Sequence, residues 1–344
     1  MERQKIHFSV VVPAYNLADH ITACLESLTA SISATPGLRA EFLVVDDASS
    51  DGTIDAVKRF DAEKGGGRIR LVELPVNLGL SGARNAGLEI AKGEYVTLVD
   101  GDDRVEANYF PMLRKCVSAD APDVVTFSAV NHYPDGRTSL VVKQRPNFQG
   151  DGPGLLLGWL VDGVESFHCW RHCYRRDFLE ANGFRFDVDL RLLEDVPWTL
   201  KCLLAARRAM YIDTPLYRYQ FRADSLINAD TPERRWREIK AIPLVIKSIS
   251  QFIAGRETSP ELLRRLRAFS VHLCFAAFHR IQRLPAYRER AAAYEYLAKA
   301  RIPEFLRANA RDLPDRERRR AFKRGFLIDW CAWWSKLLRL GGIT

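Results

Sequence analysis

Three aspartates directly follow an apolar stretch and have the spacing of a metal site. Residues 95–99 read Tyr-Val-Thr-Leu-Val, which predicts a buried strand. The carboxylates of Asp100, Asp102 and Asp103 come next. Clustered carboxylates are costly there unless they meet a cation, and ligands bind at the carboxyl ends of strands in α/β sheets. The stretch therefore predicts either a solvated turn or a site for Mg²⁺ or Mn²⁺ that also holds substrate phosphates.

Polar residues also end the two strands predicted near the start of the chain. Residues 8–12 are an apolar run stopped by Pro13, and residues 41–45 are a second run that ends in Asp46 and Asp47. Segments with helical spacing of apolar residues follow both runs. The first hundred residues thus alternate between strand and helix, which predicts a parallel α/β sheet.

A glycine-rich segment precedes the acidic stretch. Residues 77–87 contain Gly79, Gly82 and Gly87 and are predicted to form a loop that leads into a helix ending near Ala91. Their spacing differs from G-x-G-x-x-G, and no glycine follows the first strand directly. A dinucleotide-binding site of the Rossmann type is therefore not predicted.

The elements predicted after residue 103 alternate less regularly. They are a helix at 109–117, a strand at 123–128, a loop or hairpin at 131–154, a strand at 168–174, a short helix at 175–182, a helix that opens near Leu192, two short edge strands at 210–212 and 216–219, and helices throughout from about Glu233. The helix near Leu192 carries an acid pair, Glu194-Asp195, in its first turn. Alone, this pair is typical of an ordinary helix start.

The composition is that of a folded protein with room for two domains. The chain has 344 residues, of which 47% are apolar and 27% are charged. It contains no apolar run long enough to span a membrane and no signal-peptide pattern, so we expect a cytoplasmic protein. The seven cysteines are scattered, which predicts reduced core thiols. A metal site at His168, Cys169, His172 and Cys173 is a weaker alternative, because no second ligand cluster accompanies it.

Four stretches in one order resemble glycosyltransferase family 2, whose members have the GT-A fold. They are residues 10–16 (Val-Val-Val-Pro-Ala-Tyr-Asn), residues 44–53 (Val-Val-Asp-Asp-Ala-Ser-Ser-Asp-Gly-Thr), residues 77–87 with Ala-Arg-Asn at 83–85, and residues 99–103 (Val-Asp-Gly-Asp-Asp). Glu194-Asp195 resembles the acid pair of that family. The resemblance covers roughly residues 6–225. It implies an α/β catalytic domain over residues 1–228. The helical pattern that follows predicts a helical, basic extension over residues 229–344.

The resemblance also implies a role for individual residues. The expected nucleotide-sugar-binding residues are Pro13, Ala14 and Tyr15 at the base, Asn16 beside them, Asp46 as acceptor of a base N–H, Asp47 in the same wall, Arg84 near phosphate, and Asp100 and Gly101 near the ribose or metal. The expected ligands of Mn²⁺ or Mg²⁺ are Asp102, Asp100 and Asp103. Asp195 is the expected general base, and Glu194 is its catalytic neighbour.

Four further residues have two interpretations each. Trp170 and Trp198 either line an acceptor site, since aromatic rings stack on sugars, or pack in the core. Arg222 and Ser225 either belong to a loop that closes over the diphosphate or lie in a surface loop.

These residue types suit an inverting transfer from a nucleotide-sugar, most simply a UDP-sugar, to an acceptor hydroxyl. The resemblance implies that this hydroxyl belongs to a glycan or a lipid-linked saccharide. A divalent ion would stabilise the leaving diphosphate, and a carboxylate would activate the acceptor. One alternative is a sugar-1-phosphate nucleotidylyltransferase, but residues 13–16 lack its glycine- and arginine-rich signature. The other is an inactive, membrane-associated scaffold that binds nucleotide-sugars. The acids at Asp46, Asp102 and Asp195 argue against that scaffold.

Basic charge is concentrated near the C-terminus. Residues 256–344 hold 20 Lys and Arg against 9 Asp and Glu, a net charge of +11, whereas the whole chain has +8. Residues 316–324 are strongly basic and lead into Phe326, Trp330, Trp333, Trp334, Leu337 and Leu338, which share a helical face. Residues 316–340 therefore predict either an anionic membrane surface or packing on the catalytic domain or a second copy. Nucleic acid is not an expected partner, because no recognised binding fold accompanies the charge.

Overall fold

Strand β1 (Phe8–Ala14) is the centre of the parallel part of the sheet. It pairs in parallel with β2 (Ala40–Asp46) on one side and with β4 (Tyr95–Leu98) on the other. All seven of its residues are buried, as expected for a strand covered on both faces. The sequence predicts a strand over residues 8–12 that is stopped by Pro13, but the strand continues through Pro13 to Ala14, because a proline near a strand end removes only one donor.

The sheet has ten strands among the residues that the structure describes, in the order β3-β2-β1-β4-β9-β6-β10-β5, with β7 beside β6 and β8 beside β10. The remaining strands are β3 (Ile69–Glu73), β5 (Arg104–Val105), β6 (Val124–His132), β7 (Thr138–Leu140), β8 (Phe148–Gly150), β9 (His172–Arg175) and β10 (Ala209–Gln220). Strand β9 runs antiparallel to both β4 and β6, so the sheet is mixed.

Strand β10 corrects the prediction of two short edge strands. It is a single strand that pairs with β6 along one side and with β8 and β5 along the other. Its register shifts on both sides of Pro215. This irregularity interrupts the apolar pattern and makes one interior strand look like two short ones.

Helices cover the sheet on both faces. They are α1 (Ile21–Ser33), α2 (Thr53–Phe60), α3 (Gly79–Ile90), α4 (Tyr109–Asp120), α5 (Gly152–Val161), α6 (Arg176–Ala181) and α7 (Asp195–Ala205). Val10 and Val12 of β1 share a core with α1 and α4. On the opposite face α3 packs against β1, where a Cβ on Gly87 would lie 2.3 Å from Cγ1 of Val11. Glycine at this position therefore lets the helix approach the strand.

Two helix starts differ from the sequence prediction. Helix α3 begins at Gly79, inside the segment that was expected to be a loop. Helix α7 begins at Asp195 instead of near Leu192. Leu193 has φ +62°, a left-handed conformation that a bulky residue seldom adopts. That turn keeps the preceding residues out of the helix and leaves the acid pair at its first turn.

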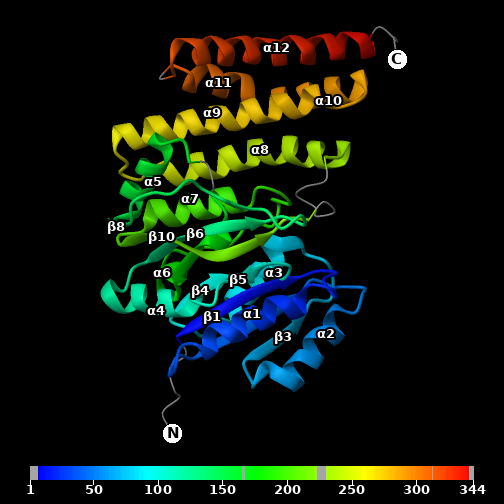
Figure 1. The fold of residues 1–344 in the computed structure, drawn as a ribbon. Coiled ribbons are helices and arrows are strands. Elements are labelled where there is room, and N and C mark those ends of the chain that lie inside the picture. The colour runs from blue at the N-terminus through cyan, green and yellow to red at the C-terminus, as the bar shows by residue number, and fades with distance from the viewer. Residues whose placement is uncertain (1–6, 165–166, 223–229, 312, 341–344) are drawn as a thin grey trace. The chain divides into compact units, whose positions relative to one another are not determined.

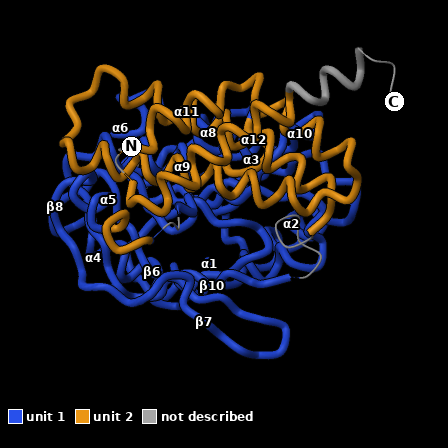
Figure 2. The backbone as a smooth tube through the Cα atoms, turned by 90° about the horizontal axis from the view of Figure 1, so that it is seen from above, with its two compact units in different colours: residues 1–158, 164–189, 194–222 blue, residues 159–163, 190–193, 223–344 orange. Residues whose placement is uncertain are grey.

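The structure describes residues 7–164, 167–222, 230–311 and 313–340, and for residues 333–340 it describes the backbone alone. The chain divides into two units, coloured separately in Figure 2. Unit 1 comprises residues 1–158, 164–189 and 194–222, and unit 2 comprises residues 159–163, 190–193 and 223–344. Unit 1 contains the whole sheet described above.

Unit 2 consists mainly of five helices that lie one above another in Figure 1. They are α8 (Pro232–Ile253), α9 (Pro260–Gln282), α10 (Tyr287–Lys299), α11 (Ile302–Asn309) and α12 (Asp315–Leu340). Their apolar faces form a separate core that includes Ile242, Cys274 and Leu306. None of the helices in the described ranges combines the length and the apolar character that crossing a bilayer requires. All seven cysteines are free, and six of them are buried.

Candidate active site

Three loops meet at the carboxyl ends of β1, β2 and β4. The backbone N–H of Asp47 donates to the carbonyl of Ala14 at 2.8 Å, and that of Gly101 donates to the carbonyl of Pro13 at 3.3 Å. Asn16, with φ +53°, accepts from the backbone of Ser50 at 2.9 Å through its side-chain oxygen. These bonds fix one edge of the sheet as a rigid polar surface.

Asp46 has a buried carboxylate of which only one oxygen accepts a hydrogen bond. Its Oδ2 accepts from the backbone N–H of Ser49 at 2.9 Å, whereas Oδ1 is buried and has no partner in the described part of the chain. A buried acceptor without a partner is costly, so this atom indicates a ligand with a donor group. Tyr15, on the neighbouring loop, is exposed.

Asp47 holds the start of helix α3. Its two carboxylate oxygens accept from the backbone N–H groups of Leu78 at 2.7 Å and Gly79 at 2.8 Å. The helix N-terminus favours this negative charge. Asp47 therefore shapes the site by fixing where α3 begins.

Arg84 lies at the centre of the site. Its side chain is 2% exposed. One terminal nitrogen donates to Oε1 of Glu194 and Oδ1 of Asp195, both at 2.8 Å, and the other donates to Oδ1 of Asp100 at 2.9 Å. The sequence prediction placed Arg84 at a phosphate. In the structure the guanidinium is enclosed by three carboxylates, which lie up to 111 residues away in the chain.

Burial and mutual charge shape the ionisation of this cluster. Burial raises the pKa of Glu194, and the negative charge of Asp195 raises it further, while Arg84 opposes both. The pKa of Asp100 is raised by burial in the same way and is lowered by Arg84. Burial alone would lower the pKa of the Arg84 guanidinium, but its acidic neighbours raise it well above the usual value. The arginine therefore stays charged, and the acids depend on it.

The two remaining aspartates of the acidic stretch have different surroundings. Asp102 pairs with Arg222 at 2.6 Å at the edge of a cavity. Asp103 is buried, and its oxygens accept from the hydroxyl of Tyr217 and the backbone N–H of Gln220, both at 2.7 Å. Both oxygens of Asp103 are thus engaged within the protein, whereas Asp102 faces the cavity. Ser225 lies outside the described residues.

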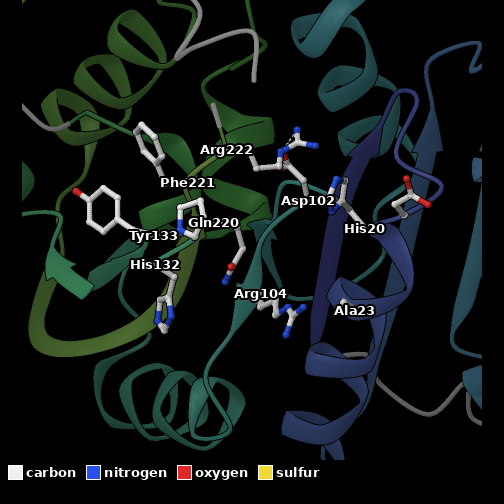
Figure 3. A pocket seen from close by; sticks show the side chains of 11 residues that line it. His20, Ala23, Asp102, Arg104, His132, Tyr133, Gln220, Phe221 and Arg222 are labelled. Atoms are coloured by element: carbon white, nitrogen blue, oxygen red, sulfur yellow. Dashed lines mark hydrogen bonds and ion pairs between the residues drawn. The ribbon is translucent and has the colours of Figure 1, made fainter. Parts of the chain in front are cut away.

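The cavity beside Asp102 has a volume of about 230 Å³. Figure 3 shows the side chains around it, among them His20 directly before α1, Arg104 of β5, His132 of β6 and Arg222 shortly after β10. The sequence analysis selected only Asp102 and Arg222 from this lining. His20 could have been found from its place in the loop after β1, but the others are brought there by the order of strands in the sheet.

Both tryptophans are core residues, so the packing interpretation applies. Trp170 is 3% exposed and stacks on Tyr217, with ring centroids 4.3 Å apart, and on His168 at 4.9 Å. Trp198 stacks on Phe186 at 4.0 Å. Neither ring has a face open to a sugar. Within the described ranges, no group of three His, Cys, Asp or Glu side chains is arranged to hold a metal ion, and this includes residues 168–173.

Comparison with known proteins identifies the family. The model of glycosyl transferase family 2 matches residues 9–181, half of the chain. The chain belongs to glycosyltransferase family 2. The uncharacterized glycosyltransferase EpsJ of Bacillus subtilis is 30% identical over 220 residues, which are 63% of this chain and 62% of EpsJ. YibD of Escherichia coli is 30% identical over 217 residues, 61% of this chain and 60% of YibD. The chain thus matches about three-fifths of the length of these family 2 relatives.

Solved structures of similar fold cover more of the chain. Staphylococcus aureus TarS 1–349 in complex with UDP-GlcNAc has a TM-score of 0.70 at 22% identity, and the match covers 95% of this chain and 87% of TarS 1–349. The mannosyltransferase PcManGT of Pyrobaculum calidifontis, in complex with GDP-Man and Mn²⁺, has a TM-score of 0.54 at 18% identity, with 94% and 88% covered. The expected GT-A fold with a helical C-terminal region is therefore confirmed.

Proposed function

We propose that this family 2 member is an inverting glycosyltransferase. It would move a sugar from a UDP-sugar to a hydroxyl of a glycan or lipid-linked saccharide. The observation that carries the proposal is the buried cluster in which one guanidinium joins the acid pair of α7 to Asp100, directly beside the edge formed by Asp46 and Asp102. Acceptor activation and donor binding can therefore occur within one small region.

The donor proposal depends on Asp46. Its partnerless buried oxygen, Oδ1, suits the imide N–H of uracil, which is a donor in that base. The exposed ring of Tyr15 is available to stack on the base. The similar TarS fragment binds UDP-GlcNAc, which supports a uridine nucleotide here without fixing the sugar.

Asp102, with Asp100, would hold a divalent ion. Mg²⁺ and Mn²⁺ bound together with substrate phosphates need only one or two protein carboxylates, so the absence of a three-acid cluster in the described residues is compatible with this role. Asp102 is partly exposed at the cavity, and Arg222 already provides it with a cationic partner. Bound there, the ion would stabilise charge on the leaving diphosphate.

Asp195 is the better candidate of the two acids for general base. Its side chain is 18% exposed, compared with 9% for Glu194. An acceptor hydroxyl can therefore reach Asp195 more readily and transfer its proton to that carboxylate as it attacks the sugar. Attack from the face opposite the leaving diphosphate inverts the anomeric centre.

A thermal-shift panel tests the donor and metal assignments. The purified chain would be heated with UDP, GDP, CDP, TDP or NAD, each with and without Mn²⁺, because a ligand that binds only the native state raises Tm. We expect a Mn²⁺-dependent rise with UDP that is lost in Asp102→Asn. A rise with another nucleotide would change the donor, and a rise unchanged in D102N would remove the metal role of Asp102. No rise with any nucleotide, in protein shown to be folded, would contradict the proposed donor binding.

We also propose that the protein binds the anionic, cytoplasmic face of a membrane through α12. Phe322, Phe326 and Trp330 lie four residues apart, so they follow one line on the helix, and they are 41%, 71% and 49% exposed. The opposite side of α12 is buried at Ala321 and Ile328. The exposed aromatic line is therefore the outward face of a helix that is already packed within unit 2.

Basic residues accompany this line. Arg316, Arg319, Arg320 and Lys323 are exposed on the first half of α12. Aromatic and basic side chains on one exposed helical face suit the interface of an anionic bilayer. The charge complementarity favours lipid over a second copy of this chain, because the same basic residues would repel each other across a symmetric contact.

Vesicle co-sedimentation tests the membrane proposal. We expect binding to phosphatidylcholine vesicles only when they contain phosphatidylglycerol, and about a tenfold loss or more in R319E/K323E. Arg59 and Lys115, exposed on α2 and α4, supply the matched reversal R59E/K115E, which should bind normally. Phe326→Ser should also weaken binding, whereas the exposed Val188→Ser in unit 1 should not. Equal losses in the matched variants, or dimerisation without vesicle binding, would overturn the proposal.

A further inference from the structure

Arg84 has no access to solvent, yet it carries a charge. Its side chain is 2% exposed, and all three of its ion-pair partners are carboxylates. Burying a cation is favourable only when such partners accompany it. The carboxylates come from two distant parts of the chain, Asp100 after β4 and the pair Glu194-Asp195 at the start of α7. Arg84 is therefore the connection between these two parts.

We propose that Arg84 is a positioning residue for sugar transfer, which sets the place of the Asp195 carboxylate relative to the donor side of the site. This inference rests on the proposed function, because it assigns Arg84 a task in that reaction. Arg84 itself would touch neither donor nor acceptor, since its guanidinium is covered. It would act by holding Asp195 and Asp100 in one fixed arrangement, within the tolerance that in-line attack requires.

The helix that carries Arg84 is held in place by residues next to the expected nucleotide site. Helix α3, which carries Arg84, is fixed at its N-terminus by Asp47 and at Gly87 by close packing on β1. The guanidinium also lies 5.3 Å from the centroid of the Phe186 ring. Helix α3 thus connects Asp47, beside the expected nucleotide site, to the acid pair at the start of α7.

The backbone before the acid pair is strained. The φ of +62° at Leu193 is a left-handed conformation, which is unfavourable for a bulky residue that is not glycine. Such strain persists only where surrounding contacts compensate for it. The ion pairs from Arg84 to Glu194 and Asp195, directly after the turn, are contacts of this kind.

Arg84→Lys is the central variant, because lysine keeps the charge but loses the fork that reaches three carboxylates. We expect kcat of UDP-sugar transfer to fall about 100-fold, with KM for the donor and the Tm shift with UDP nearly unchanged. Arg171→Lys is the matched control. Arg171 is also fully buried in unit 1, but it donates to the backbone carbonyl of Phe127, away from the acid cluster. It should keep normal kcat.

A double-mutant comparison separates positioning from general stability. If Arg84 acts through Asp195, R84K should cause no further loss of kcat in an Asp195→Asn background. Should R84K fail to fold, Phe186→Leu, which removes the ring beside the guanidinium, should lower kcat and leave the Tm shift with UDP intact.

Three outcomes would overturn the inference. They are normal kcat in R84K, an equal fall of kcat in R171K, or a fall of kcat in R84K that repeats fully in the D195N background. Loss of UDP binding in R84K, with kcat at saturating donor unchanged, would instead return Arg84 to the phosphate role. The proposed function fails separately, if the unmodified chain shows neither nucleotide binding nor transfer.

Discussion

The site holds two groups of buried or partly buried acids by different means. Asp46 and Asp47, at the end of β2, accept hydrogen bonds from backbone N–H groups of nearby residues. The carboxylates of Asp100, Glu194 and Asp195 are joined by one shared side-chain donor, Arg84. A group fixed by backbone donors survives most substitutions around it. A group fixed by one guanidinium depends on a single residue, so the two groups should respond differently to mutation.

The largest expected effect is on catalysis at the arginine-held group. Asp195→Asn should lower kcat about 10³- to 10⁴-fold while the Tm shift with UDP persists, because an amide cannot accept the acceptor's proton. Asp177→Asn is the matched control, since Asp177 also lies at a helix start, in α6, but is 71% exposed. Steady-state kinetics would check this. Normal turnover by D195N would remove the base assignment.

The second prediction concerns stability. Arg84→Ala should lower the free energy of unfolding by about 3–5 kcal/mol, because the buried Glu194 and the partly buried Asp100 and Asp195 lose their cation. Arg175→Ala should cost much less, since its partner Asp123 also accepts from the backbone N–H groups of Arg207 and Arg208. Urea unfolding of both variants would check this. Equal losses of unfolding free energy in the two variants would mean that backbone donors do not stabilise a carboxylate that has lost its arginine. The contrast between the two groups of acids would then be wrong.

Asp46→Asn should have a smaller effect, confined to the ligand. The affinity for UDP should fall about tenfold, because a charged acceptor for the base N–H becomes neutral. The fold should persist, since an amide oxygen can still accept from Ser49. Asp51→Asn, in the same loop but bonded to Ala18 and Thr53, should bind UDP normally. Titration calorimetry would compare them, and unchanged affinity in D46N would exclude the contact with the base.

The smallest expected effect is a pH dependence. Burial raises the pKa of Glu194 from 4.5 to about 7. Between these values the native state binds a proton that the unfolded state has released, so this group's contribution to stability falls as pH rises through the window. Glu194→Gln cannot titrate. Relative to the unmodified chain, it should therefore gain on the order of 1 kcal/mol between pH 5 and 8 in urea unfolding. A constant difference would contradict the raised pKa.

Local patterns in the sequence predicted much of this arrangement. The apolar runs at β1, β2 and β4 and the acids that follow them were predictable, because parallel strands align their carboxyl ends. The partners of Arg84 were not, since the contacts to Glu194 and Asp195 span 110 and 111 residues. Nor was the start of α3 at Gly79, because glycine is a poor helix former and the carboxylate of Asp47, from a distant loop, fixes that start. The partners of Arg84 and the start of α3 depend on contacts between distant parts of the chain, which local propensity does not predict.

The distribution of cysteines has a practical consequence for spectroscopy. Six of the seven thiols are buried, and only Cys331, on α12, is partly accessible. Because thiol reagents need an accessible thiolate, a maleimide dye should label this position first. The other six cysteines would not need to be replaced. The native chain therefore has an attachment point for a fluorophore at the residue directly after Trp330. A change in emission at that point would report directly on the surroundings of the helix.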